Sequence, residues 1–170
     1  MKTQRSFAIW SSSLLLPIFL LSISVGGQAQ SSKGNKYACS EPKPAALCNA
    51  SNTCGSASTP CAVDIKRTSS AAQATPSIPN AKGNSTFCVK TGTTVTWQSL
   101  SKNTGFVMDF GPSSPFDQGG TIIGGSDRAV STVAKKEGCY RYSAGACVSG
   151  AIYGMCGTGN AELIVVGGGN

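Results

Sequence analysis

The residues best suited to chemistry lie in one stretch near the C-terminus, CYRYSAGACVSGAIYGMCG, which spans residues 139–157. It holds three cysteines, three tyrosines and one methionine. Thiolate and thioether sulfur are ligands that Cu(I) accepts, so Cys139, Cys147, Met155 and Cys156 form a candidate metal set. The alternative is that these cysteines form disulfides, in which case no thiolate is left to bind a metal.

The N-terminus indicates the compartment in which these cysteines are found. Residues 1–29 have the pattern of a secretory signal peptide: a basic start, an apolar run over residues 14–25, and small residues at Gly27 and Ala29. We expect cleavage before Gln30 and a secreted or periplasmic protein with no membrane span after cleavage. An uncleaved anchor is the alternative, which the proline and serines near the run disfavour.

All the cysteines follow this leader, and their even number in an exported chain predicts a disulfide framework. Its members are Cys39, Cys48, Cys54, Cys61, Cys88, Cys139, Cys147 and Cys156. Many pairings are possible, so the connectivity cannot be derived from the sequence. Cys147 and Cys156 enclose a loop suited to a local disulfide. The spacings of eight and nine residues differ from C-x-x-C, so we favour disulfides over a soft-metal site, with Met155 as a packing residue.

The mature chain divides by composition. Residues 30–80 are rich in Ser, Ala, Pro, Lys and Asn and predict an irregular, cysteine-rich segment and linker. Residues 81–167 contain short alternating segments separated by turn residues, which predict a β-sandwich. The predicted strands lie within residues 85–100, 105–111, 121–123, 128–134, 138–143 and 161–167. The core should include Trp97, Phe106, Phe110 and Tyr140.

Within residues 87–166 the chain resembles the cupredoxins, the small Greek-key β-sandwich proteins typified by plastocyanin. VKTGTTVTW resembles a strand–turn–strand of that family, and GCYRYSAGA…GMCGTGNAELIVV resembles its last hairpin, which carries the copper loop. The residues that carry most of the likeness are Gly138, Tyr140, Tyr142, Gly154, Met155 and Gly157. The resemblance implies an all-β, cupredoxin-like Greek-key sandwich preceded by an irregular, disulfide-tied N-terminal segment.

The resemblance fails at the copper site. A type 1 copper site needs two imidazoles and a thiolate, usually with an axial thioether, but the sequence contains no histidine. The position of one family histidine falls at Gly105 or Phe106, and that of the family's cysteine ligand falls at Ala144. Of the four ligands, Met155 is the one that has a counterpart. We therefore expect a copper-free protein with no cofactor.

The same composition argues against an enzyme. Without histidine, Ser-His-Asp and Cys-His arrangements cannot form, and the seven acidic residues are scattered. GGTIIGGSDR lacks the G-K-[ST] ending of a phosphate loop.

The partners are limited by charge and by apolar residues. Removing Lys2 and Arg5 from 14 basic residues leaves 12 against 7 acidic residues, a net charge of +5. These charges are scattered, which argues against nucleic-acid binding. They suit weak attraction to anionic polymers of the cell envelope or to lipid head groups. Ile152, Tyr153 and Met155 could form an apolar docking patch, because copper-carrying cupredoxins use the same end of the sandwich for partner docking.

The sequence therefore predicts an exported, non-catalytic binding or structural module that acts on an envelope or extracellular protein or polymer. The alternative is a redox or metal-handling protein that uses Cys and Met sulfur for electron transfer or Cu(I) binding. The two hypotheses differ in the state of the cysteines.

Overall fold

Nine strands and one short helix make up most of the part of the chain that the structure describes. The structure is a computed structural model, and it describes residues 39, 41–148 and 156–168. The elements in chain order are α1 (Pro44–Leu47), β1 (Cys61–Thr68), β2 (Ala71–Pro76), β3 (Phe87–Lys90), β4 (Thr94–Gln98), β5 (Thr104–Asp109), β6 (Thr121–Gly125), β7 (Val130–Val133), β8 (Gly138–Val148) and β9 (Cys156–Val166). The predicted leader, residues 1–29, lies outside the described ranges. Within them, no helix is long and apolar enough to cross a membrane.

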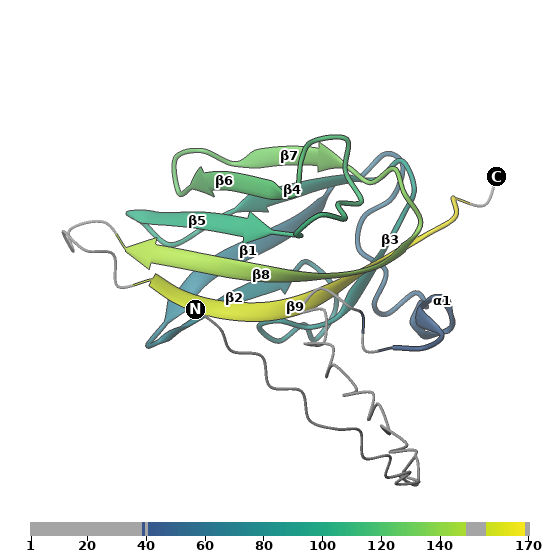
Figure 1. Cartoon of the computed structure of the whole chain (residues 1–170), viewed down its shortest axis with the longest axis horizontal. Coiled ribbons are helices and arrows are strands. Elements are labelled where there is room, and N and C mark those ends of the chain that lie inside the picture. The colour runs from purple at the N-terminus through teal and green to yellow at the C-terminus, as the bar shows by residue number, and fades with distance from the viewer. Residues whose placement is uncertain (1–38, 40, 149–155, 169–170) are drawn as a thin grey trace, which may run out of the picture. The chain divides into compact units, whose positions relative to one another are not determined.

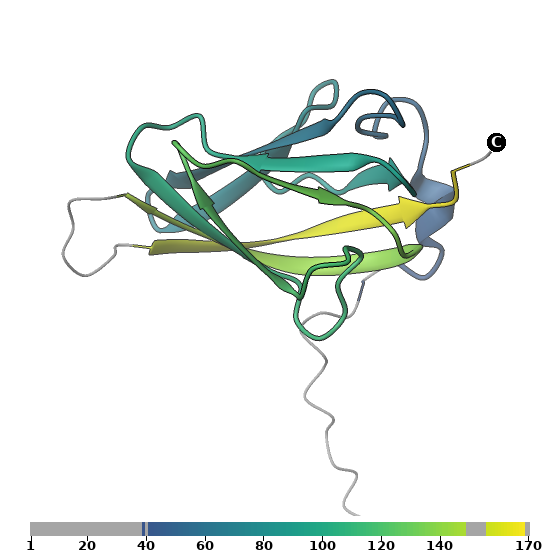
Figure 2. The ribbon, with the colours of Figure 1, turned by 90° about the horizontal axis from the view of Figure 1, so that it is seen from above.

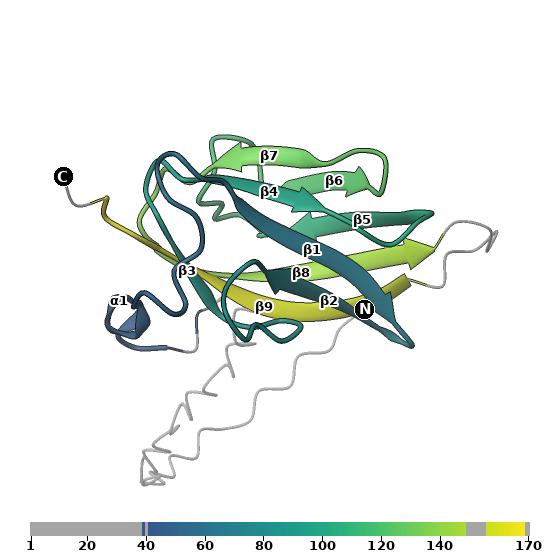
Figure 3. The same cartoon turned by 180° about the vertical axis from the view of Figure 1, so that it is seen from behind.

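The strands form two mixed sheets that pack face to face (Figures 1 and 2). The 4-stranded sheet has the order β2-β1-β4-β7, with β1 and β4 parallel and the other neighbours antiparallel. The 5-stranded sheet has the order β3-β9-β8-β5-β6, with β3 and β9 parallel. Figure 3 shows the 4-stranded sheet from its own side of the molecule. The prediction of an all-β protein with sandwich-like sheets is confirmed.

Alternation along the strands decides which side chains fill the space between the sheets. In β5, Phe106 and Met108 are buried while Val107 between them is exposed, because successive side chains of a strand point to opposite faces. Tyr140, which was expected in the core, is partly buried and packs against it. The last two strands are longer than predicted, since β8 continues to Val148 and β9 starts at Cys156.

Trp97 is at the centre of the core. Its ring meets the rings of Phe110, Phe116 and Tyr142 edge-on, with centroid distances of 5.8, 5.9 and 5.8 Å, a geometry that the ring quadrupoles favour. The indole Nε1 donates a hydrogen bond of 3.0 Å to Thr132 Oγ1, so its polar group is satisfied. The buried hydroxyl of Tyr142 has no hydrogen-bond partner among the described residues, and burial raises the pKa of this phenol.

Residues 61–76 differ from the prediction of an irregular segment, because they form two strands of the 4-stranded sheet. β1 and β2 pair antiparallel, and β1 also lies beside β4. Cys61, Val63 and Ile65 of β1 are fully buried, as are two alanines of β2. The composition of this segment resembles a linker. The alternating Ala72 and Ala74 are nevertheless fully buried, so small side chains supply the apolar face of β2. Among the described residues, irregular structure precedes Cys61 and includes α1.

The described segment before β1, residues 41–54, crosses the outward face of the 5-stranded sheet, and we call it the strap. The disulfides Cys39–Cys139 and Cys48–Cys88 tie this part of the chain to β8 and β3. Cys88, Ile164 and Cys139 lie side by side in the register of β3, β9 and β8. Ile164 is buried although its strand neighbours Leu163 and Val165 are the residues that point inward. The strap therefore covers Ile164 between two covalent anchors.

The strap also completes the edge of β3. The N–H of Cys54 donates to the carbonyl of Cys88 at 2.8 Å, and the N–H of Cys88 donates to the carbonyl of Asn52 at 2.9 Å. A third disulfide, Cys54–Cys61, joins the end of the strap to the start of β1. An exposed sheet edge is a template for pairing with another chain, and here the protein's own N-terminal segment occupies it.

In the 4-stranded sheet, a side chain takes the place of a neighbouring strand for the edge strand β2. Asn84 Oδ1 accepts from the N–H of Ala74 at 2.9 Å, and Asn84 Nδ2 donates to the carbonyl of Ala72 at 3.2 Å. Asn84 has a φ of 63°, a left-handed conformation that asparagine tolerates better than most residues. The side chain of Asn84 thus satisfies two backbone groups of this edge strand, and its own N–H donates to a third, the carbonyl of Ala74, at 2.8 Å.

Candidate functional site

The predicted docking residues belong to the connection between β8 and β9. Ile152, Tyr153 and Met155 lie outside the described residues, but the strands on either side of them are described. Val148, the last residue of β8, pairs with Thr104 at the start of β5. The β8–β9 connection therefore joins the end of the sandwich that also holds the β4–β5 connection, which is on the left in Figure 1. We call this the β8–β9 end.

Two apolar side chains are exposed at the β8–β9 end. Leu100, in the β4–β5 connection, has 74% of its surface exposed, and Val148 has 40%. The N–H of Leu100 donates to Asp64 Oδ1 at 2.9 Å, so this connection is attached to β1. An exposed leucine in an anchored connection adds to the apolar surface that a partner could bury.

A hollow of about 470 Å³ lies beside these residues. It is lined by Asn103, Thr104, Gly105, Ile123, Gly124, Gly125, Ser126, Asp127 and Arg128. The N–H of Ser126 donates to the carbonyl of Thr104 at 2.9 Å, which ties the β6–β7 turn to β5. The exposed Asp127 and Arg128 place one charge of each sign at the rim. Such a mixed lining suits a contact surface and contains no pair of groups arranged for acid–base chemistry.

The positions that the resemblance assigns to one histidine ligand and to the cysteine ligand carry no ligand atoms. Ala144 is 1% exposed and lies opposite Met108 of β5 and Gly159 of β9. Phe106 is 3% exposed and lies opposite Ala146, and its neighbour Gly105 has no side chain. Since β8 continues as a paired strand beyond Ala144, core side chains occupy this region.

The disulfide prediction is met by the cysteines that the structure describes in full. Cys39 pairs with Cys139, Cys48 with Cys88, and Cys54 with Cys61. Cys147 is also disulfide-bonded, and its Cα lies opposite that of Cys156 in the register of β8 and β9. The side chain of Cys156 lies outside the described residues. No described cysteine is free.

The candidate Cu(I) set is not brought together. Cys139 and Cys147 lie on the same strand, β8, eight residues apart in numbering. At a rise of about 3.3 Å per residue, roughly 26 Å separates them along the strand. One metal ion cannot bind both sulfurs at that distance. Met155 lies outside the described residues.

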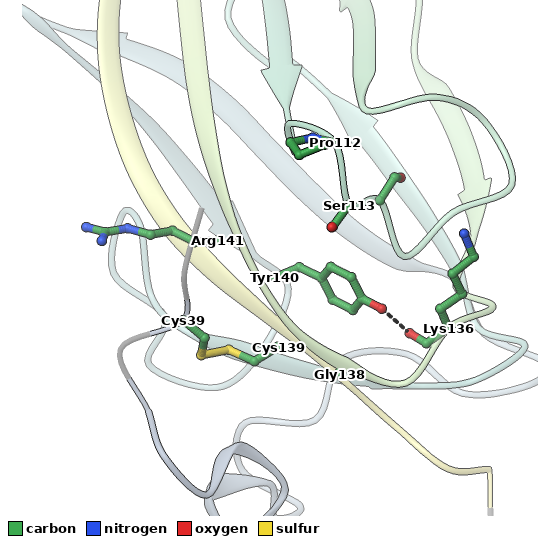
Figure 4. Close-up of a pocket in the computed structure, with 9 residues that line it drawn as sticks. Cys39, Pro112, Ser113, Lys136, Gly138, Cys139, Tyr140 and Arg141 are labelled. Carbon is green, nitrogen blue, oxygen red and sulfur yellow. Dashed lines mark hydrogen bonds between the residues drawn. A yellow bond between two sulfur atoms is a disulfide. The ribbon is translucent and has the colours of Figure 1, made fainter. Parts of the chain in front are cut away.

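A second hollow, of about 460 Å³, lies near the opposite end of β8 (Figure 4). The Cys39–Cys139 disulfide forms part of its wall, and the Tyr140 hydroxyl lies 3.0 Å from the carbonyl of Lys136, to which it donates. Burial raises the pKa of this phenol, so the hydroxyl remains a donor. Figure 4 shows the side chains of Arg141 and Lys136 extending in different directions, so they do not converge on one ligand.

Near that hollow, the Sγ atoms of Cys39 and Cys139 and a carboxylate oxygen of Glu162 lie within 4.8 Å of one another. Three such atoms would suit a metal only if both sulfurs were thiolates. The two sulfurs are bonded to each other, so this cluster has one carboxylate and no thiolate.

Sequence reasoning missed Leu100 as a surface residue. Leu100 follows the alternating strand that contains Trp97 and precedes the polar turn SKN. Its position immediately after a strand, with polar residues following it, was the available signal.

Comparison with known proteins adds no family to these observations: no family description, no curated protein and no solved structure matches the chain.

Proposed function

We propose that the chain is an exported, non-catalytic binding or structural module with a copper-free, cupredoxin-like β-sandwich. It contacts an envelope or extracellular protein or polymer through the β8–β9 end. The observation that carries the proposal is the exposure of Leu100 and Val148 at the end where β8 leads into the connection that contains the predicted docking residues Ile152, Tyr153 and Met155.

The order of the strands supports the Greek-key part of this proposal. Several neighbouring strands are distant in sequence: β1 with β4, β4 with β7, β5 with β8, and β3 with β9. The chain crosses between the sheets after β2, β3, β4, β6 and β7. Such crossings between two layers are typical of Greek-key sandwiches.

The chemistry of the β8–β9 end supports a module without copper. Ala144 and Phe106 occupy the positions where the cupredoxin likeness would require sulfur and nitrogen ligands, and both are buried in the core. The alternative function, redox or metal handling through Cys and Met sulfur, needs thiolates. Cys139 and Cys147 are both disulfide-bonded, which favours the binding or structural module.

The experiment that tests the docking end compares capture by matched variants. The purified protein is immobilised and exposed to the envelope fraction of its own source. Leu100→Asp and Val148→Asp place a charge on the exposed apolar surface, and we expect each to lose the bound component that the wild-type protein retains. Leu47→Asp is the control, because Leu47 is also exposed, at 41%, but belongs to α1 in the strap.

Equal capture by the wild type, Leu100→Asp and Val148→Asp refutes docking at the β8–β9 end. Loss of capture by the Leu47→Asp control instead assigns binding to the strap. Two solution measurements address the alternative function. Alkylation without reductant should modify no cysteine, and added Cu(II) should produce no intense blue absorption. Reactive thiols that bind Cu(I) would support the metal-handling protein.

A further inference from the structure

The edge strands of the two sheets are protected to different degrees. The strap pairs with β3, and the Asn84 side chain bonds to β2. β7 leads directly into Lys135 and Lys136, whose N–H groups donate to the carbonyl of Pro115, and lysines next to an edge discourage strand pairing. β6 is bonded to β5 and, at its last residue, to Arg128. We infer that β6 pairs antiparallel with β6 of a second copy of this chain.

The hydrogen-bond pattern identifies the open backbone groups of β6. The N–H of Phe110 donates to the carbonyl of Gly120 at 2.7 Å, and Phe110 and Gly120 continue the β5–β6 register. Antiparallel partners alternate between bonded and non-bonded pairs, so Ile122 and Gly124 direct their backbone groups toward β5. Thr121, Ile123 and Gly125 direct theirs away from β5. Gly125 exchanges two bonds with Arg128, so among the described residues the outward backbone groups of Thr121 and Ile123 have no partner.

These groups are complementary to a second copy of themselves. A twofold axis beside Ile122 places Thr121 of each copy opposite Ile123 of the other. Residues that face each other as a bonded antiparallel pair exchange both of their hydrogen bonds. The two pairs make four hydrogen bonds, which use every open N–H and carbonyl of Thr121 and Ile123 in both copies.

The side chains of β6 also favour a second copy of the chain as the partner of this strand. Ile123 is 65% exposed and lies opposite Val107 of β5, which in turn lies opposite Gly145 of β8. A Cβ on Gly145 would lie 2.8 Å from Val107 Cγ1, so the glycine provides the space over which Val107 lies. In the two-copy arrangement, Ile123 lies opposite Thr121 of the other copy and diagonally across from the other copy's Ile123, on the same face of the joined sheet.

Charge also favours a second copy at this edge. The chain is net positive, yet residues 119–125 contain no charged side chain, so two copies meet here without like charges in contact. Asp117, which pairs with Lys135 at 3.2 Å, precedes β6 and Arg128 follows it, and both are exposed. Antiparallel pairing brings the Arg128 end of one copy toward the Asp117 end of the other.

Sedimentation equilibrium of the purified protein tests the inference. The joint is short, which places it among weak interfaces, so the range should extend from about 10 μM to about 1 mM. We expect the average mass to rise from monomer toward dimer over this range. Ile123→Pro removes an outward N–H without removing a bond to β5, and we expect it to remain monomeric. Ser131→Pro makes the matched change on β7 and should dimerise like the wild type.

A monomeric wild type at the highest concentration overturns the inference, as does a dimer that survives Ile123→Pro. Hydrogen exchange of the wild type gives an independent result if Ile123→Pro does not fold. The amides of Thr121 and Ile123 should exchange more slowly at high than at low protein concentration, while that of Ser131 should not change. Equal exchange of Thr121 and Ile123 at both concentrations overturns pairing at β6.

Discussion

Removing the Cys48–Cys88 disulfide tests how the strap stabilises the sandwich. The variant C48A/C88A opens a loop whose ends are 40 residues apart. The entropy of closing such a loop corresponds to about 4 kcal/mol in the unfolding free energy at 25 °C. Ile164 lies beneath the strap, and exposing an isoleucine completely would cost a further ~1.5–3 kcal/mol. Cys39–Cys139 and Cys54–Cys61 still hold the strap on either side, so we expect Ile164 to stay largely covered.

The expected loss is therefore about 4 kcal/mol, measured by guanidinium unfolding without reductant. Hydrogen exchange supplies a local measurement, because the amides of residues 54 and 88 bond across the strap and β3. Both amides should exchange faster in C48A/C88A than in the wild type. Leu47→Ala is the control within the strap; it removes an exposed side chain and should change the free energy of unfolding by less than about 0.5 kcal/mol.

A loss below about 1 kcal/mol in C48A/C88A, with unchanged exchange at residues 54 and 88, would refute this reasoning. It would mean that the backbone bonds of the strap hold it in place without the disulfide. A loss of unfolding free energy well above the contribution of loop-closure entropy would mean that the strap separates from the sheet and Ile164 becomes exposed.

Three further predictions concern single side chains. Burial raises the pKa of Tyr142 above its ordinary value of 10.0, so the folded chain keeps a proton that the unfolded chain releases. The contribution of Tyr142 to stability should therefore be constant below pH 10.0 and fall above it. Tyr142→Phe should remove that contribution to the alkaline fall in urea unfolding curves and change stability at neutral pH by no more than about 1 kcal/mol, since the hydroxyl has no partner among the described residues; an unchanged alkaline fall would contradict this. Asn84→Ala should cost about 1–3 kcal/mol, because two groups of β2 lose their partner. Asn80→Ala is the control, because Asn80 has a similar φ, 57° against 63° for Asn84. It measures the cost of placing alanine at a positive φ, and equal losses of stability in both variants would show that the side-chain bonds of Asn84 contribute nothing. Gly159→Ala should lower the melting temperature strongly, because the new Cβ would meet the carbonyl oxygen of Ala72, whereas Gly119→Ala enters open space; similar melting temperatures for the two variants would contradict the close approach of β2 to β9.

The strands that could be predicted are those with local alternation of large and polar residues. VTW and GFVMDF are of this kind, and they form β4 and β5. β1 was missed although its buried Val63 and Ile65 alternate with Asp64 and Lys66. β2 could not be predicted, because its buried Ala72 and Ala74 are small residues that also occur in linkers. Their place as strands depends on contacts with β4 and β9, which are distant in sequence.

At the candidate site, the sequence excluded one chemistry and left the geometry open. The lack of histidine rules out a type 1 copper site whatever the fold. The sequence could not show that Leu100 and Val148 lie at the same end of the sandwich, because that follows from the pairing of β5 with β8.

The sequence by itself determined the ligand atoms that the chain contains, the even set of cysteines, and the alternation that produces strands. These are properties of residue type and local spacing. Only the tertiary structure decided that Cys139 bonds to Cys39, about 26 Å along β8 from Cys147. It also decided that the strap pairs with the edge of β3 and that, in the part of the chain that the structure describes, no strand lies on the outer side of β6. These depend on which distant strands become neighbours, and that choice is made by burial of the whole core.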